Sequence, residues 1–149
     1  MARTRRDGMT AELDELSSTL MGDALDLLAD GVEMGVLLVA QDASGAVASY
    51  EFGDDSAEAS LDAARAHVGK LARSSGDPDA GISVPVRYAL AYDGAVDQGD
   101  GSFADALILE FGERGYRSYS AFSLYEGRGA GESFAWTDAA PAGEVAPLL

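Results

Sequence analysis

The chain has 149 residues, of which 47% are hydrophobic and 24% are charged, and this is the composition of one soluble globular domain. Its charge is unusual, because 26 acidic residues stand against 10 basic ones and the formal net charge is −16. A surface this negative repels phosphate backbones and anionic lipids, so no nucleic-acid partner and no membrane partner are expected.

Several kinds of site are excluded by what the sequence lacks. It contains no cysteine, which removes disulfides, thiolate zinc sites, iron–sulfur clusters and cysteine nucleophiles. Its one histidine, His67, is too few for a zinc site built on two or three imidazoles. The GxSxG elbow of serine hydrolases is also missing. We therefore assign no catalytic residue, no metal ligand and no cofactor.

The two ends of the chain differ from its centre. The basic stretch Met1–Gly8 is not followed by the apolar core of a secretory signal, and no apolar run reaches the ~18 residues of a membrane span. We therefore expect a cytoplasmic protein. Residues 1–9 are predicted to be a disordered basic N-terminus, or an extension of a chain that naturally begins at Met9. Residues 10–137 then form a single α+β domain, and 138–149 a surface tail.

The first part of the chain predicts a helix followed by a hairpin. Leucines recur at three- and four-residue spacing between Thr10, a natural N-cap, and Asp30, so a helix is expected there. The apolar run 35–40 and the alternating segment 46–52 flank a turn, which is typical of a β-hairpin.

A second helix is predicted after the hairpin. Asp55 and Glu58 have the spacing of a capping box and mark its start, and the helix ends near Ser74. His67 falls on the polar side of this helix, away from the apolar stripe. We interpret it as a surface histidine, with a general base as the remote alternative.

From residue 82 onward the pattern is that of strands. Alternation predicts strands over 82–92, 103–111 and 116–125, with a short last strand over 133–137. The segment 103–111 is the most apolar and is expected to be central. Short turns favour antiparallel pairing. The element order α-β-β-α-β-β-β therefore predicts an α+β fold, in which an antiparallel sheet of five or six strands has two helices on one face.

The face of the sheet opposite the helices is predicted to carry small residues and tyrosines. A solvated face would be richer in charged residues, whereas small and amphipathic side chains suit a protein interface. Self-association there would give a homodimer, because two-fold dimers are the commonest assemblies. The alternatives are a bare face or a face covered by the tail. The candidate interface residues are Ala89, Ala91, Ala106, Ile108, Tyr119, Ala121 and Tyr125.

Two further segments have some features of ligand sites. The glycine-rich stretch 126–133 has the backbone freedom to hold an anion beside Arg128, but it lacks the phosphate-loop pattern and is predicted to be a flexible turn. No register of a calcium loop fits the acid-rich stretch 93–105. This stretch is predicted to be a solvated hairpin loop holding Asp93, Asp97, Asp100 and Asp105.

Two resemblances to known families can be stated. The segments 87–96 (RYALAYDGAV) and 105–115 (DALILEFGERG) resemble a pattern in a family of small bacterial proteins of unknown function, which implies no activity. The order of the predicted elements is similar to that of the roadblock family, small dimeric modules that regulate GTPases and motors. That second resemblance, which is one of fold alone, implies a non-catalytic dimer.

Three functions are consistent with the sequence. The first is a non-catalytic protein-binding or regulatory module that acts through its sheet face or its acidic surface. The second is an acidic inhibitor or immunity-type protein, whose negative charge attracts a basic partner. The third is a small hydrolase that uses carboxylates with a divalent ion. The first is favoured over an enzyme because the sequence contains no recognisable set of nucleophile, base and metal ligands.

Overall fold

The structure, a computed structural model, describes residues 4–53 and 56–149. It contains two α-helices, α1 (Ala11–Ala29) and α2 (Ala57–Arg73), and confirms the predicted α+β class and element order. The sheet has one strand more than the upper prediction. Its strands are β1 (Val36–Asp42), β2 (Val47–Phe52), β3 (Pro85–Asp97), β4 (Phe103–Glu113), β5 (Ser118–Glu126), β6 (Ala135–Trp136) and β7 (Ala140–Val145).

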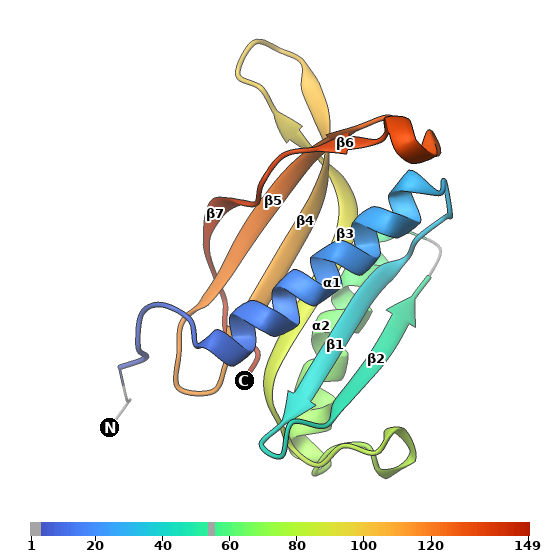
Figure 1. Ribbon diagram of the computed structural model, residues 1–149. Helices are drawn as coiled ribbons and strands as arrows, with labels where there is room; N and C mark the ends of the chain where they lie inside the picture. Colours follow the sequence, from blue (N-terminus) through green and yellow to red (C-terminus); the bar gives the residue numbers. More distant parts are fainter. Residues whose placement is uncertain (1–3, 54–55) are drawn as a thin grey trace.

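All the strand pairs are antiparallel, and β3 pairs with β1 rather than with its predecessor β2. The order across the sheet is β2-β1-β3-β4-β5-β6, and β7 pairs with β5 beside β6. β4 is central, as predicted, and β3 lies between it and β1. Figure 1 shows the sheet as a curled layer with β2 at one edge and β7 at the other.

The two helices lie on opposite faces of this sheet, so the prediction that both cover one face is wrong. In Figure 1, α1 crosses in front of the strands and α2 lies behind them. Ala89 and Ala91 pack under α1, whereas their chain neighbours Tyr88 and Leu90 pack under α2. Successive residues of a strand point to opposite faces. A strand that is apolar at every position therefore needs a cover on both sides.

The face under α1 alternates small and large side chains across the strands. Ala89 lies opposite Phe111, and Leu109 lies between Ala91 on one neighbouring strand and Ala121 on the other. The alanines leave room for the leucines of α1, which share one core with this face. The sequence prediction placed small residues of β3 and β4, among them Ala89 and Ala106, on a common face, which the register between these strands contradicts.

The N-terminal segment is partly held by the body of the protein. The Arg6 amide donates to the Gly115 carbonyl at 2.9 Å, and the Arg117 amide donates to the Arg6 carbonyl at 2.8 Å. Gly8 donates its amide to the Tyr119 hydroxyl at 3.0 Å. These bonds tie Arg6 and Gly8 to the β4–β5 turn and to β5, and residues 1–3 lie outside the described part. The disorder predicted for residues 1–9 stays a prediction.

Part of the predicted surface tail, β7, adds a strand to the sheet. β7 pairs with β5, with Phe122 opposite Ala140 and Ser118 opposite Val145. Beyond β7, Leu148 and Leu149 pack against the core on the α2 side. The sequence gives no clear strand pattern here, because Pro141 and Gly143 interrupt the alternation of apolar and polar residues.

Side-chain caps fix where both helices begin. The Thr10 hydroxyl accepts from the Leu13 amide at 3.1 Å, as its position in the sequence predicts. α2 has Ser56 as its N-cap, and its hydroxyl accepts from the Ala59 amide at 3.0 Å. The predicted cap Asp55 lies outside the described residues. No helix in the described ranges has both the length and the hydropathy that crossing a bilayer requires.

His67 lies between α2 and β2 and is half-buried, not a surface residue as predicted. Its ring meets Tyr50 edge-on, with ring centroids 4.4 Å apart, and the Phe52 ring lies 5.6 Å away. Its Nε2 atom is buried without a hydrogen-bond partner among the described residues. Burial, followed by the nearby Lys70 ammonium, lowers the pKa of His67, and the Asp77 carboxylate only partly opposes this.

The free energy of unfolding is expected to decrease as the pH is lowered from about 7.5 to 5.5. In this range His67 of the unfolded chain becomes protonated, whereas the lowered pKa keeps His67 of the folded protein neutral. His67→Phe keeps an aromatic ring in place and removes this titration. Urea denaturation at both pH values measures the effect, since His67 is the only histidine in the chain. An equal loss of stability in the wild type and in His67→Phe would contradict the assignment.

Candidate functional site

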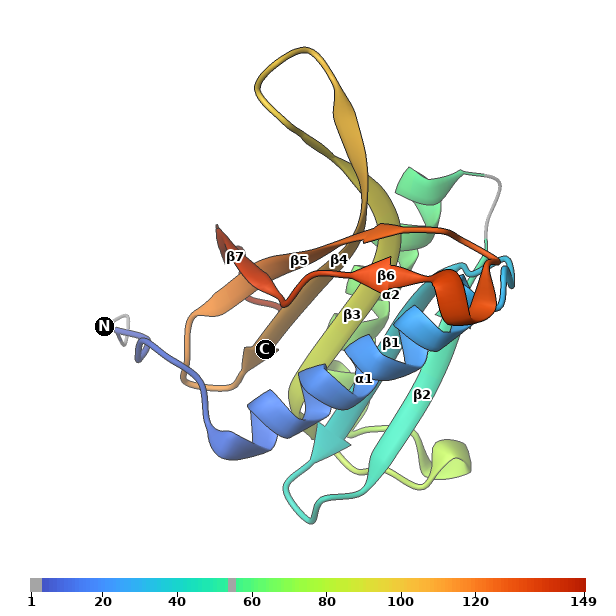
Figure 2. The same ribbon diagram turned by 45° about the horizontal axis from the view of Figure 1, so that its top comes forward.

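A groove runs beside α1, over the part of the sheet that this helix leaves open. α1 packs mainly against β3 and β4, so β1 and β2 emerge beside it on the same face (Figures 1 and 2). The groove has a volume of about 280 Å³. Its floor is apolar and is formed by Leu16, Leu20 and Val39, and Val47 on β2 is 46% exposed at its side.

Helical periodicity explains why one side of the groove is acidic. Positions three, four, seven and eight apart share a helix face, so Glu12, Glu15 and Asp23 line the groove together with Leu16 and Leu20. All three acids are exposed. Within residues 4–53 and 56–149, none of them has a cationic partner. The sequence of α1 contains no lysine or arginine, so this wall is uniformly negative.

One cation reaches the end of the groove, and it is already paired. The Arg87 guanidinium donates to the Gln41 amide oxygen at 2.8 Å, and Gln41 lines the groove. The same guanidinium donates to Glu113 at 2.8 Å, and this carboxylate also accepts from the Thr10 hydroxyl at 2.8 Å. Arg87 is therefore neutralised where it lies, and the groove keeps its negative charge.

The candidate interface residues do not form an uncovered face. The structure divides them between two faces, because Ala106 and Ile108 point to the α2 side. On the α1 side the helix covers most of the others, so the premise of an open face is wrong there. Buried within the chain are Ala89, Ala91, Ala106, Ala121 and Tyr125, whereas Ile108 and Tyr119 are half-buried.

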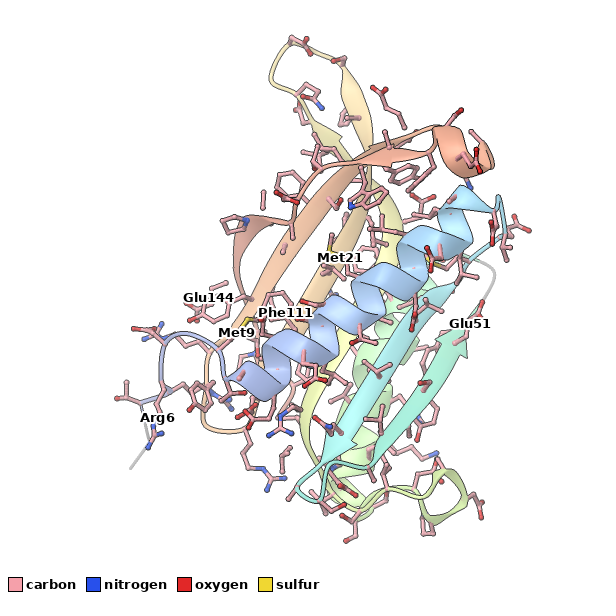
Figure 3. The ribbon with its side chains drawn as sticks, in the orientation of Figure 1. Arg6, Met9, Met21, Glu51, Phe111 and Glu144 are labelled. Carbon is pink, nitrogen blue, oxygen red and sulfur yellow. The ribbon has the colours of Figure 1, made fainter. Side chains whose placement is uncertain are left out.

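Two of these residues do line a depression near the N-terminus. Tyr119 and Ala121 form its wall with Met9 and Phe111, and the space has a volume of about 350 Å³. Figure 3 shows Met9 and Phe111 close together beside the start of α1. The lining is almost wholly apolar, and residues of β7 complete it.

The glycine-rich stretch 126–133 caps the end of α1 and is not merely a flexible turn. The Gly129 amide donates to the Leu28 carbonyl at 2.9 Å, which satisfies one of the last carbonyls of the helix. Gly31 packs against Gly129 so closely that a Cβ at Gly31 would lie 3.1 Å from the Gly129 Cα. Arg128 forms an ion pair with Asp93 at 2.9 Å, so its charge is already used within the fold and is not free for an anion.

The acids of the β3–β4 hairpin do not converge. Asp97 accepts from the Gly99 amide at 2.8 Å and Asp100 accepts from the Ser102 amide at 2.9 Å, so both shape the hairpin loop, as predicted. Asp93 accepts from the Tyr125 hydroxyl at 2.5 Å. In the part of the chain that the structure describes, no group of three or more histidine, aspartate or glutamate side chains is placed to hold a metal ion.

Three buried carboxylates, Asp42, Glu110 and Glu113, were not singled out from the sequence, and all three hold other parts of the fold in place. Asp42 accepts hydrogen bonds from Ser44 and Ser83, and these hold the pKa of Asp42 well below its usual range. Glu110 is bound by Arg65 of α2 and by the Tyr92 hydroxyl. The acidic wall of the groove was also missed, although the sequence offered a signal: the helix has acids at several positions and no base.

Comparison with known proteins gives no match, whether with protein-family models, with curated proteins or with solved structures. The similarity to the roadblock family therefore remains one of element order. The function has to be argued from the geometry and charge of the surface alone.

Proposed function

We propose that this protein is a non-catalytic binding module for a basic protein partner, and that the partner binds in the groove beside α1. The observation that carries this proposal is the combination of an apolar floor, Leu16, Leu20 and Val39, with three unpaired carboxylates on one wall. Apolar contact supplies affinity, and the carboxylates select a cationic partner and attract it at long range. The net charge of −16 acts in the same direction.

The shape of the groove favours an amphipathic helix as the occupant. It follows α1 for about three turns, and a helix laid beside α1 would place an apolar stripe on the floor. Lysine or arginine residues beside that stripe would meet Glu12, Glu15 and Asp23. A second copy of this chain is a poor occupant, because it carries the same net charge of −16 and its α1 contains acids and no base, so its approach would bring like charges together.

The proposal is tested with a synthetic amphipathic helix in which lysines flank a leucine stripe, titrated into the protein in a calorimeter. Glu15→Lys is expected to weaken binding roughly tenfold by reversing one charge of the wall. Val47→Ser, which removes apolar surface beside the floor, is expected to weaken it roughly fivefold. Affinity should fall as salt is added, since exposed charges are screened.

The matched control is Asp62→Lys, which makes the same charge change at an exposed site on α2, on the other face of the sheet. It should leave the affinity almost unchanged. If Glu15→Lys and Asp62→Lys weaken binding equally, the charge acts through the whole protein and the groove is not the site. A glutamate-flanked version of the helix that binds as tightly would also refute the proposal.

A further inference from the structure

The hairpin that joins β3 to β4 extends beyond the body of the protein as an arm (Figures 1 and 2). The pairing between β4 and β5 ends at Ala106 and Leu124, while the pairing between β3 and β4 continues to Phe103. Beyond that point β5 continues to Glu126 without β4, and its other edge pairs with β6, with Tyr125 opposite Trp136. In the described residues, the β4 segment Phe103–Asp105 thus has a strand partner on one side only.

A cleft opens where the two strands separate. It has a volume of about 720 Å³ and lies between the arm on one side and β5 and β6 on the other. Phe103 and Trp136, the most exposed large apolar residues described, both line it, with 70% and 56% of their surfaces exposed. Large aromatic residues exposed in this way mark interaction sites more often than chance allows.

The charge of the cleft has one sign. Asp105 and Glu126 line it, and none of its lining residues is basic. Trp136 stacks against Phe134, with ring centroids 6.1 Å apart, and Phe134 packs in turn on Tyr125. The indole is thus supported from one side while more than half of its surface is open. A supported aromatic ring beside carboxylates is suited to a lysine or arginine side chain.

The backbone of the arm offers hydrogen bonds as well. The Gln98 amide donates to the Ser102 carbonyl at 3.0 Å, so the backbone groups of Ser102 point toward β3. Direction alternates along a strand, so the amides and carbonyls of Phe103 and Asp105 point away from β3, toward the cleft. An extended peptide placed there would add to the sheet as a new strand.

We propose that this cleft, hereafter the arm cleft, binds an extended segment of a partner protein in which lysine or arginine alternates with apolar residues. The segment pairs with the free edge of Phe103–Asp105, and its basic side chains lie near Trp136 and the carboxylates of Asp105 and Glu126. The proposal is independent of the groove beside α1, which uses other residues. A second copy of the chain does not fit, because its arm would bring another Asp105 and no basic side chain to a cleft that already holds Asp105 and Glu126.

Trp136 provides the measurement, because it is the only tryptophan in the chain. A short capped peptide of alternating lysine and valine is titrated into the full chain while tryptophan emission is recorded. A saturable change in emission is expected. Phe103→Ser should weaken binding roughly tenfold and Asp105→Asn roughly threefold, and neither exposed substitution should disturb folding. The same peptide with N-methyl groups on the residues that face the β4 edge should bind more weakly than one methylated on the other residues.

The reciprocal control is Val47→Ser, which should leave the emission titration unchanged, just as Phe103→Ser should leave binding of the amphipathic helix unchanged. Failure of one proposal is thereby distinguished from failure of the other. The arm cleft proposal is overturned if emission does not change, if Phe103→Ser binds the peptide as tightly as the wild type, or if a glutamate–valine peptide binds equally well. It is also overturned if the two methylation patterns have the same effect, or if Phe103→Ser abolishes a dimer, because the cleft would then hold a second copy.

Discussion

Arg65→Met is expected to lower the free energy of unfolding by about 3 kcal/mol, because it leaves the Glu110 carboxylate buried without its cation. Glu110 lies in β4 on the α2 side and is only 4% exposed. The Arg65 Nε and Nη2 atoms donate to its two oxygens at 3.1 and 2.5 Å, and the Tyr92 hydroxyl donates to it at 2.9 Å. Removing one partner of a buried ion pair costs stability over a known range, and the lower end of that range applies here because the Arg65 side chain is itself 38% exposed.

The double variant Arg65→Met/Glu110→Gln isolates the cause of this loss. The neutral amide still offers an oxygen to Tyr92, so the double variant should recover more than half of the stability lost in Arg65→Met. Thermal denaturation should show Arg65→Met melting roughly 6–12 °C below the wild type. If the double variant is as unstable as Arg65→Met, the missing arginine acts through lost packing on the sheet and not through an unpaired charge.

Gly76→Ala is expected to cost about 3 kcal/mol, the other large effect, through backbone strain and overlap together. Gly76 follows α2 and has φ +96°, which side chains rarely tolerate. A Cβ there would overlap the backbone of Ser83, and backbone atoms cannot move aside as a flexible side chain can. The Gly76 amide also donates to the Leu71 carbonyl at 2.8 Å, which holds the residue at the end of the helix.

Two other glycines separate these contributions, with urea denaturation as the measurement. Gly81 lies in the same loop at φ +78° with open space around its Cα, so Gly81→Ala should show the cost of strain alone, about 1 kcal/mol. Gly22 lies in the middle of α1 with nothing near it, and Gly22→Ala should stabilise the protein by about 0.5–1 kcal/mol. A loss in Gly76→Ala no larger than in Gly81→Ala would show that the loop moves to avoid the overlap.

Local patterns were sufficient to predict both helices and the strands β1 to β6, but not β7. The leucine spacing after Thr10, the turn between β1 and β2 and the alternation of β3 to β5 each depend on a few neighbouring residues, and all appear where expected. Across the sheet, however, the face of a residue depends on register. Ala89 faces Phe111 and not another alanine because the strands pair with that offset, which the turn lengths of the sequence left undetermined.

The candidate site was predicted less well than the fold, for a related reason. The interface prediction took alternation within β3, β4 and β5 and assumed that small residues share a face. The register places Ala89 and Ala91 on one side of the sheet and Ala106 on the other, so these residues do not form one surface. The groove and the arm cleft arise from where α1 lies on the sheet and where β5 leaves β4. Both are relations between distant segments, which no local pattern contains.

The placement of one helix on each face has a consequence for how the protein opens. β1 and β3 pack against both helices, whereas β5 packs mainly against its neighbouring strands and β7 lies at the outer edge. Local unfolding should therefore begin at β7, and the helices should separate from β1 and β3 last. The arm cleft lies on the side of the sheet that should open first, so a strand bound there would stabilise the edge that is least stable.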